Sequence, residues 1–281
     1  MSEENVQLVS PSSPVGSSQG SSQSSVQGGC SPSDITGKKV FFLYPTVSIQ
    51  NQIITELIQQ EFEVYVSRDC TRLARALKRY PDSIVFANID DGIKPAEWEK
   101  WIATLRTALP NVCVGVFSAS NDESKRDKFI NDLHVKCGYI GLKVDMTKAV
   151  AVVLEILNKM DIKGRRKYLR ASTEREATAT VNIPLGGDYL NGAVKDISVV
   201  GISCIFENDP GLAKNELVKD IQIRLQTMLI KVEAVIFGSR VDGHQKIYVL
   251  IFTQRIDPDV RVKIRKYIQH NLQCKMDPEI G

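Results

Sequence analysis

From residue 38 to residue 160 the chain alternates short apolar runs with longer stretches whose apolar residues recur at helical spacing. The runs predict strands at 40–44, 62–66, 83–89, 112–117 and 139–142, and the longer stretches predict helices at 49–61, 70–80, 96–109, 122–133 and 146–160. Strand–helix repeats of this kind are joined by right-handed crossovers, which make the strands parallel and cover both faces of the sheet. We therefore predict a doubly wound parallel α/β domain over residues 37–160.

After Met160 the alternation stops, and the chain becomes a series of short segments rich in β-branched residues. Strands are expected at 177–183, 189–194, 201–206, 216–226, 230–237 and 246–252, separated by turn signals and not by helices. Such a series predicts a six-stranded antiparallel β-barrel. A final helix is expected to begin at Asp257-Pro258 and to run to about Gln273. Residues 161–281 thus form a second, all-β domain in this interpretation.

Residues 1–36 are rich in Ser, Gln, Gly and Pro and contain few large apolar residues. Such a segment buries too little surface to offset its conformational entropy, so we predict a disordered Ser-rich tail. A phosphorylation tail or a partner-binding arm is the functional alternative to a flexible leader. The first nine residues carry no basic residue, and no run of about 18 apolar residues occurs, so we expect a cytoplasmic protein without a membrane span.

Cysteine and histidine usage argues against disulfides and a resident metal. The six cysteines are scattered without a CxxC pair, and the three histidines form no ligand motif. We expect reduced, buried thiols, no metal site and no cofactor.

Chemically distinctive residues follow the expected strands of the α/β domain: Asp90 after the third, Ser118 after the fourth and Lys143 after the fifth. The order of elements and these positions resemble the receiver domain of bacterial response regulators, where they imply a phosphoacceptor, a hydroxyl and a lysine. Tyr44 and Pro45 stand where receivers place the acidic pair that holds magnesium. The resemblance therefore implies a receiver-like scaffold that has lost its chemistry, with a phosphorylation-responsive adaptor acting through Asp90 as the alternative.

Two short motifs flank the start of the expected barrel. Arg166 and Arg170 form an RxxxR pattern, and about 25 residues later Asp196, Ser198 and Gly201 form a DxSxxG pattern. Either pattern alone occurs by chance, but both in this order beside a six-stranded barrel are specific. Together they resemble the PilZ domain, the bacterial receptor for cyclic di-GMP, over roughly residue 162 to the end of the chain.

The residue types of both motifs suit a cyclic dinucleotide. A guanidinium fork matches the O6 and N7 acceptors of guanine, stacks on a purine and pairs with phosphate, so Arg166 and Arg170 are candidate ligand-binding residues. In an extended segment they have the same parity and address one face. Arg165 is a candidate additional cation for a stacked, two-molecule form of the ligand.

The second motif supplies the complementary groups. The carboxylate of Asp196 can accept hydrogen bonds from guanine N1–H and the exocyclic amine, and Ser198 offers a hydroxyl two residues further along the same strand. Gly201 permits a positive φ or a close approach of the backbone to the ligand. The purely structural alternative is that Asp196 and Ser198 cap a turn at the end of the strand.

Charge is unevenly divided between the two expected domains. From Asp161 onward there are 19 Lys and Arg against 15 Asp and Glu, a net +4, while the rest of the chain is near −1. A modest positive charge suits a small dianion better than a nucleic acid, which is the disfavoured alternative. The basic face of the final helix is interpreted as solvated in preference to a partner or membrane surface.

These features predict a non-enzymatic cyclic di-GMP receptor in bacterial second-messenger signalling. The arginine segment also tethers the two domains, so ligand binding is expected to reorient them. The family resemblance implies control of motility, biofilm or virulence through a downstream protein partner, contacted through the receiver-like domain. No catalytic triad, Cys–His pair or P-loop pattern points to an enzyme.

Overall fold

The computed structural model describes residues 37–143, 145–174, 176 and 178–281. The predicted tail at 1–36 lies outside the described residues. The α/β half contains β1 (Val40–Leu43), η1 (Ile49–Ile54), α2 (Thr55–Gln59), β2 (Val64–Ser67), α3 (Cys70–Ala76), β3 (Ile84–Asn88), α4 (Pro95–Ala108), β4 (Cys113–Ser118), α5 (Glu123–Asp127), η2 (Lys128–Asp132), β5 (Tyr139–Gly141) and α6 (Met146–Lys159). Every strand and helix expected there is present, with ends displaced by a few residues.

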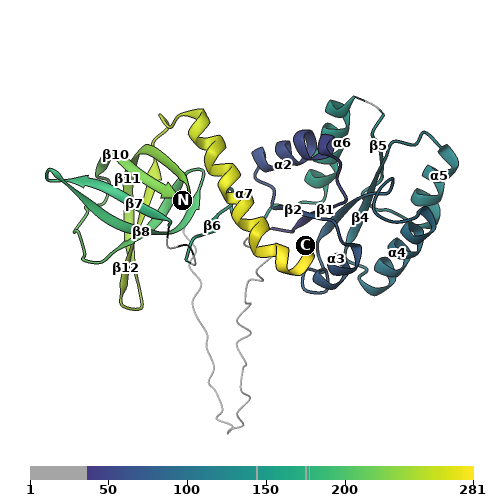
Figure 1. Cartoon of the computed structure of the whole chain (residues 1–281), viewed down its shortest axis with the longest axis horizontal. Coiled ribbons are helices and arrows are strands. Elements are labelled where there is room, and N and C mark those ends of the chain that lie inside the picture. Colours follow the sequence, from purple (N-terminus) through teal and green to yellow (C-terminus); the bar gives the residue numbers. More distant parts are fainter. Residues whose placement is uncertain (1–36, 144, 175, 177) are drawn as a thin grey trace, which may run out of the picture. The chain divides into compact units, whose positions relative to one another are not determined.

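The five strands of the α/β half form one parallel sheet in the order β2-β1-β3-β4-β5. This is a doubly wound order whose switch point lies between β1 and β3. Successive residues of a strand face opposite sides, so Phe41 and Leu43 pack with α3 and α4, whereas Val40 and Phe42 pack with η1, α2 and α6. Both faces of the sheet are therefore covered, as predicted (Figure 1).

The remaining strands close into a barrel. They are β7 (Thr180–Leu185), β8 (Asp188–Ser198), β9 (Gly201–Phe206), β10 (Leu217–Leu225), β11 (Met228–Asp242) and β12 (Gln245–Phe252). The antiparallel order β8-β7-β10-β11-β12-β9 returns to β8, because β8 also pairs with β9. The two-residue β6 (Ala171–Ser172) adds to β8 from outside this ring. The predicted six-stranded antiparallel barrel with a C-terminal helix is confirmed.

The C-terminal helix α7 (Pro258–Ile280) starts where predicted but extends beyond Gln273, so the expected end was wrong. Its first part buries Ile264 and Ile268 in the barrel core. Its last part buries Met276 and Ile280 in the core of the α/β half. Burial of these last residues stabilises turns that Pro278 would otherwise be expected to end.

Side chains of α7 also satisfy the free edge of the parallel sheet. The Gln269 amide donates to the Val64 carbonyl at 2.6 Å. In the other direction, the hydroxyl of Ser67 in β2 donates to the backbone carbonyl of Ile280 in α7 at 2.7 Å. Strand β2 is at the end of the sheet, where backbone groups lack a strand partner on one side. Helix α7 thus contacts both the barrel and the α/β half, and its contacts with the α/β half include hydrogen bonds as well as apolar packing.

Five described cysteines are free thiols. Cys137 and Cys204 are buried as expected, but Cys274 is exposed, so the expectation of buried thiols was wrong there. Its sulfur lies 3.5 Å from Nε2 of His270, one turn earlier on α7. This i, i+4 pair was not expected from the sequence, and two side chains alone are not a metal site. In the described part of the chain, no helix combines the length and apolar character needed to cross a membrane.

Candidate functional site

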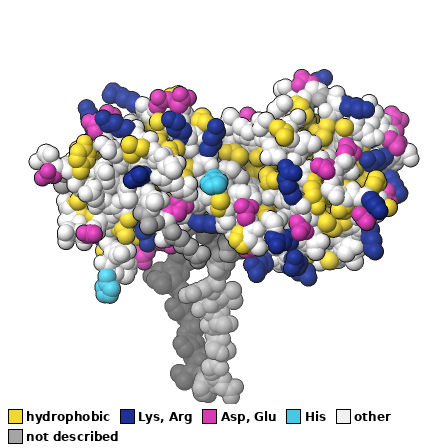
Figure 2. Space-filling model, viewed as in Figure 1, with side chains coloured by type: hydrophobic (Ala, Val, Ile, Leu, Met, Phe, Trp, Pro, Cys, Tyr) yellow, Lys and Arg dark blue, Asp and Glu magenta, His cyan; other side chains and the backbone are white. Residues whose placement is uncertain are grey.

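Basic and acidic side chains are interspersed on the barrel surface. Lys246 pairs with Asp209 at 2.8 Å, and Lys195 pairs with Glu174 at 2.9 Å. The face drawn in Figure 2 shows the same mixture over the barrel elements, without one continuous basic field. On this face, cations such as Lys246 and Lys195 thus have acidic partners close by.

The segment between α6 and β6 carries the three candidate arginines. It bends at Arg165, Lys167 and Tyr168, so the alternation of an extended strand does not set where its side chains point, and that part of the sequence argument was wrong. Tyr168 and Leu169 pack against the barrel core, while Arg166 and Arg170 are exposed. The apolar pair thus anchors the segment and leaves its cations in solvent.

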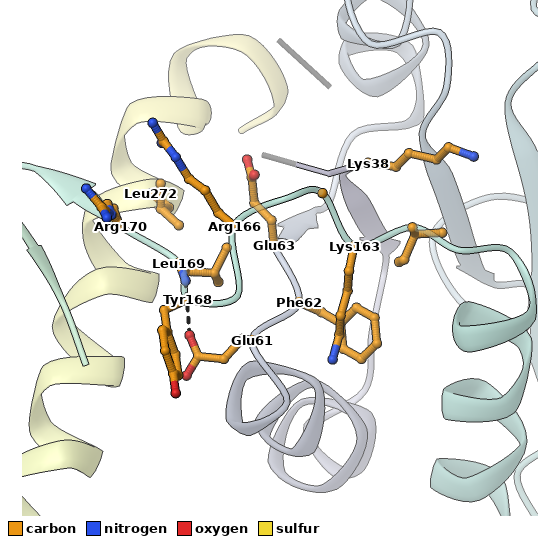
Figure 3. Close-up of a pocket in the computed structure, with 12 residues that line it drawn as sticks. Lys38, Glu61, Phe62, Glu63, Lys163, Arg166, Tyr168, Leu169, Arg170 and Leu272 are labelled. Carbon is orange, nitrogen blue, oxygen red and sulfur yellow. Dashed lines mark hydrogen bonds between the residues drawn. The ribbon is translucent and has the colours of Figure 1, made fainter. Parts of the chain in front are cut away.

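Arg166 and Arg170 nevertheless line one small cavity, together with Glu61, Leu169 and Leu272 (Figure 3). Its volume is about 50 Å³. Pockets that enclose drug-sized ligands hold about 300–1,000 Å³. A cavity of this size is too small to enclose a cyclic dinucleotide.

The two motifs meet at Arg170 and Asp196. The Arg170 Nη1 atom lies 3.8 Å from Oδ1 of Asp196, with side chains that are 51% and 27% exposed. The pairing of β6 with β8 aligns Ser172 with Asp196, which brings the end of the arginine segment to this strand. A bulge between Val194 and Asp196 locally re-aims the side chains of β8, and the Ser203 hydroxyl donates to the Asp196 carboxylate.

Ser198 and Gly201 stabilise the turn between β8 and β9. Ser198 is 5% exposed, and its hydroxyl donates to the Gly201 carbonyl at 3.2 Å while accepting from the Val200 N–H at 3.4 Å. Gly201 has no left-handed φ, contrary to one of the two expectations, and a Cβ there would lie 2.2 Å from the Leu250 carbonyl oxygen. Glycine is required here because β12 passes so close.

Arg165 is exposed and lines a different hollow from the other two arginines. It lines this neighbouring hollow with Lys38 and Lys163, which also line the cavity of Arg166 and Arg170, but Arg165 itself does not line that cavity. The three arginines are thus not gathered on one cavity in this arrangement.

Glu61 is a residue of this region that the sequence analysis missed. Its side chain is 10% exposed, and its carboxylate accepts from the Leu169 N–H at 3.1 Å and from Nε of Arg265 at 3.0 Å. Glu61 lies more than 100 positions before Leu169, and an acidic residue at the end of a helix carries no motif. Only the folded chain reveals the contact.

The receiver-like position Asp90 is enclosed by donors. Oδ1 accepts from the Ser118 hydroxyl at 2.8 Å and from Nζ of Lys125 at 3.3 Å, and Oδ2 accepts from the Ala119 N–H. Burial raises the pKa of Asp90, but these hydrogen bonds outweigh it and hold the pKa below its ordinary value. The expected lysine, Lys143, is exposed, and the lysine that pairs with Asp90 is Lys125.

An aromatic side chain, Tyr44, directly follows β1, where the receiver resemblance predicted an acidic pair to be missing. The ring of Tyr44 lies edge-on to Trp98 with 5.9 Å between centroids and covers Gly92, where a Cβ would come within 2.4 Å of the ring. The Asn88 amide donates to the Tyr44 carbonyl at 3.0 Å. Among the described residues, no group of three or more His, Cys, Asp or Glu side chains is placed to hold a metal ion.

Residues 164–270 match the family model of the PilZ domain. No curated protein matches the chain. Similar solved structures include the PilZ domain of YcgR with c-di-GMP from Escherichia coli (16% identity, TM-score 0.35), covering 41% of this chain and 96% of that one. The Bacillus subtilis inhibitor of motility MotI/DgrA is 21% identical (TM-score 0.33), covering 38% of this chain and 50% of that one. A response regulator from Thermotoga maritima is 20% identical (TM-score 0.35), covering 43% of this chain and 98% of that one.

Proposed function

We propose that this chain, which carries a PilZ domain at residues 164–270, is a cytoplasmic, non-enzymatic receptor for cyclic di-GMP. The observation that carries the proposal is the meeting of Arg170 and Asp196 on an exposed part of the barrel. The two motifs are separated in sequence, and the fold brings the Arg170 guanidinium and the Asp196 carboxylate together where solvent can reach them. Arg166 belongs to the same segment and lines the same small cavity as Arg170.

The chemistry of the ligand fits these groups. Cyclic di-GMP is a dianion, so its phosphates and guanine acceptor edges suit the forks of Arg166 and Arg170. The carboxylate of Asp196 is an acceptor for guanine N–H groups. At 3.8 Å the contact between Arg170 and Asp196 is long for a hydrogen bond, so a ligand that inserts there replaces a weak interaction.

Ser198 and Gly201 support the ligand site indirectly in this proposal. The hydroxyl of Ser198 and the close approach at Gly201 shape the turn that follows Asp196. Arg165 joins the site only if the segment rearranges, as binding of a second, stacked ligand molecule would require.

We propose that ligand binding changes the arrangement of the α/β half relative to the barrel. A downstream protein partner in motility, biofilm or virulence control would recognise this change. The arginine segment lies directly between α6 and β6. Ligand contacts that form in one arrangement of this segment shift the population toward that arrangement. The family resemblance supports these outputs without choosing among them.

Isothermal titration calorimetry with cyclic di-GMP tests the proposal. Arg170→Ala should weaken binding by about 2 kcal/mol, roughly 30-fold in Kd, because a charge-assisted contact is lost. Arg240→Ala is the matched control, since Arg240 is an exposed arginine on β11 outside both motifs. Cyclic di-AMP, which lacks the guanine O6 acceptor and 2-amino donor, should bind more weakly. Absence of heat for the unmodified chain at tens of micromolar ligand would refute the proposal.

A further inference from the structure

The arginine segment is held from the α/β half by the carboxylate of Glu61. Its Oε2 atom accepts from the backbone N–H of Leu169, which lies between Arg166 and Arg170 in the RxxxR pattern (Figure 3). Its Oε1 atom accepts from Nε of Arg265 on α7. One nearly buried side chain therefore joins the α/β half to the segment and to the C-terminal helix.

This contact is suited to restraining the segment. Hydrogen bonds to a charged acceptor are about twice as strong as neutral ones, and Glu61 is only 10% exposed, so water competes poorly for it. The backbone N–H of Leu169 is a fixed point on the chain, so the bond constrains the path between the two arginines. Arg265 partly neutralises the carboxylate and holds its second oxygen in place.

The restrained arrangement is unfavourable for a cyclic dinucleotide. With the Leu169 contact formed, the cavity beside Arg166 and Arg170 has a volume of only about 50 Å³. The Glu61 carboxylate that lines this cavity also repels a dianion. A ligand that contacts both arginines is therefore expected to bind more tightly when the segment is released from Glu61.

We propose that Glu61 is a positioning residue that sets the affinity for cyclic di-GMP, and that ligand binding competes with its hydrogen bond to Leu169. This inference rests on the proposed receptor function. The restraint reduces the population of the binding-competent segment, and the apparent Kd rises by the inverse of that population. Release of Leu169 leaves Glu61 paired with Arg265, so the segment moves while this contact between α7 and the α/β half is kept.

Calorimetry of Glu61 variants tests the restraint. Glu61→Ala should tighten the apparent Kd for cyclic di-GMP about fivefold or more, and Glu61→Gln should tighten it less because an amide oxygen still accepts from Leu169. Glu56→Gln is the matched control, since Glu56 on α2 contacts Gln60 at the surface, and its Kd should be unchanged. An unchanged or weaker Kd for Glu61→Ala with an intact thermal transition would overturn the inference.

Amide hydrogen exchange of the unmodified chain gives a second readout that needs no variant. The Leu169 amide should be protected without ligand and should exchange faster at saturating cyclic di-GMP, while the Val194 amide, bonded to the Ala179 carbonyl, stays protected. Equal or greater protection of Leu169 with ligand would contradict competition. A chain that binds no cyclic di-GMP instead refutes the receptor function itself, so the two failures are distinguishable.

Discussion

The side chain of Gln273 occupies the place of a missing strand beside Val66. Its Nε2 atom donates to the Val66 carbonyl at 2.9 Å, and its Oε1 atom accepts from the Val66 N–H at 2.9 Å. A primary amide has the same donor and acceptor as a peptide unit, so it can complete the edge of a sheet. Because Val66 is in β2 and Gln273 is in α7, this pair links the α/β half to the helix that also covers the barrel.

Gln273→Ala should therefore lower the free energy of unfolding by about 1–2 kcal/mol, because two hydrogen bonds to a partly buried backbone are lost. Urea denaturation followed by circular dichroism measures this change. Gln59→Ala on α2 is the control, since Gln59 is exposed and should change stability by about 0.5 kcal/mol or less. Equal stability of the two variants would show that the amide pair contributes nothing.

Gly201→Ala should destabilise the barrel by about 2 kcal/mol, because the new methyl group meets the Leu250 carbonyl at 2.2 Å and backbone must shift. Gly141→Ala is the control, since no atom lies within 4 Å of a Cβ there and its φ is not left-handed. Thermal denaturation of both variants measures the difference. A Gly201→Ala variant as stable as the unmodified chain would mean that β12 shifts without a cost in free energy, and that the glycine is not needed for packing.

Asp90 should make stability depend on pH at the acidic end. Its folded-state pKa lies below the ordinary 3.8, so its stabilising contribution is complete above that value and is lost as pH falls through the lowered pKa. As pH falls below about 4, the unmodified chain should lose more stability than Asp90→Asn, whose amide does not titrate. Acid denaturation of both forms measures the difference, and parallel curves would show that Asp90 is not linked to folding.

The phosphorylation-responsive alternative predicts a labelled Asp90, and the structure predicts none. Ser118, Ala119 and Lys125 already satisfy its carboxylate, and Tyr44 stands at the position where the receiver resemblance places an acidic residue. Incubation with acetyl phosphate and magnesium, followed by intact-mass measurement, should show no added phosphoryl group. An added mass that Asp90→Asn abolishes would restore the adaptor hypothesis.

Much of the fold was predictable because it depends on local pattern. Apolar runs such as 40–44 and 201–206 correspond to β1 and β9, and the change from alternating elements to strands alone distinguished the parallel sheet from the barrel. The end of α7 was not predictable, since Met276 and Ile280 are helical through burial against residues that are far away in sequence. The spacing of His270 and Cys274 was readable from the sequence and was overlooked.

The sequence by itself determined the two architectures and the presence of both motifs, because periodicity, turn residues and motif spacing are properties of the linear chain. Only the tertiary structure decided that Arg170 meets Asp196, that Ser198 and Gly201 build a turn, and that Glu61 holds Leu169. These contacts join distant residues, and their distances depend on how strands pair and helices pack. Hydrogen bonds weaken steeply with distance and angle, so side-chain roles follow the folded backbone and not the motif alone.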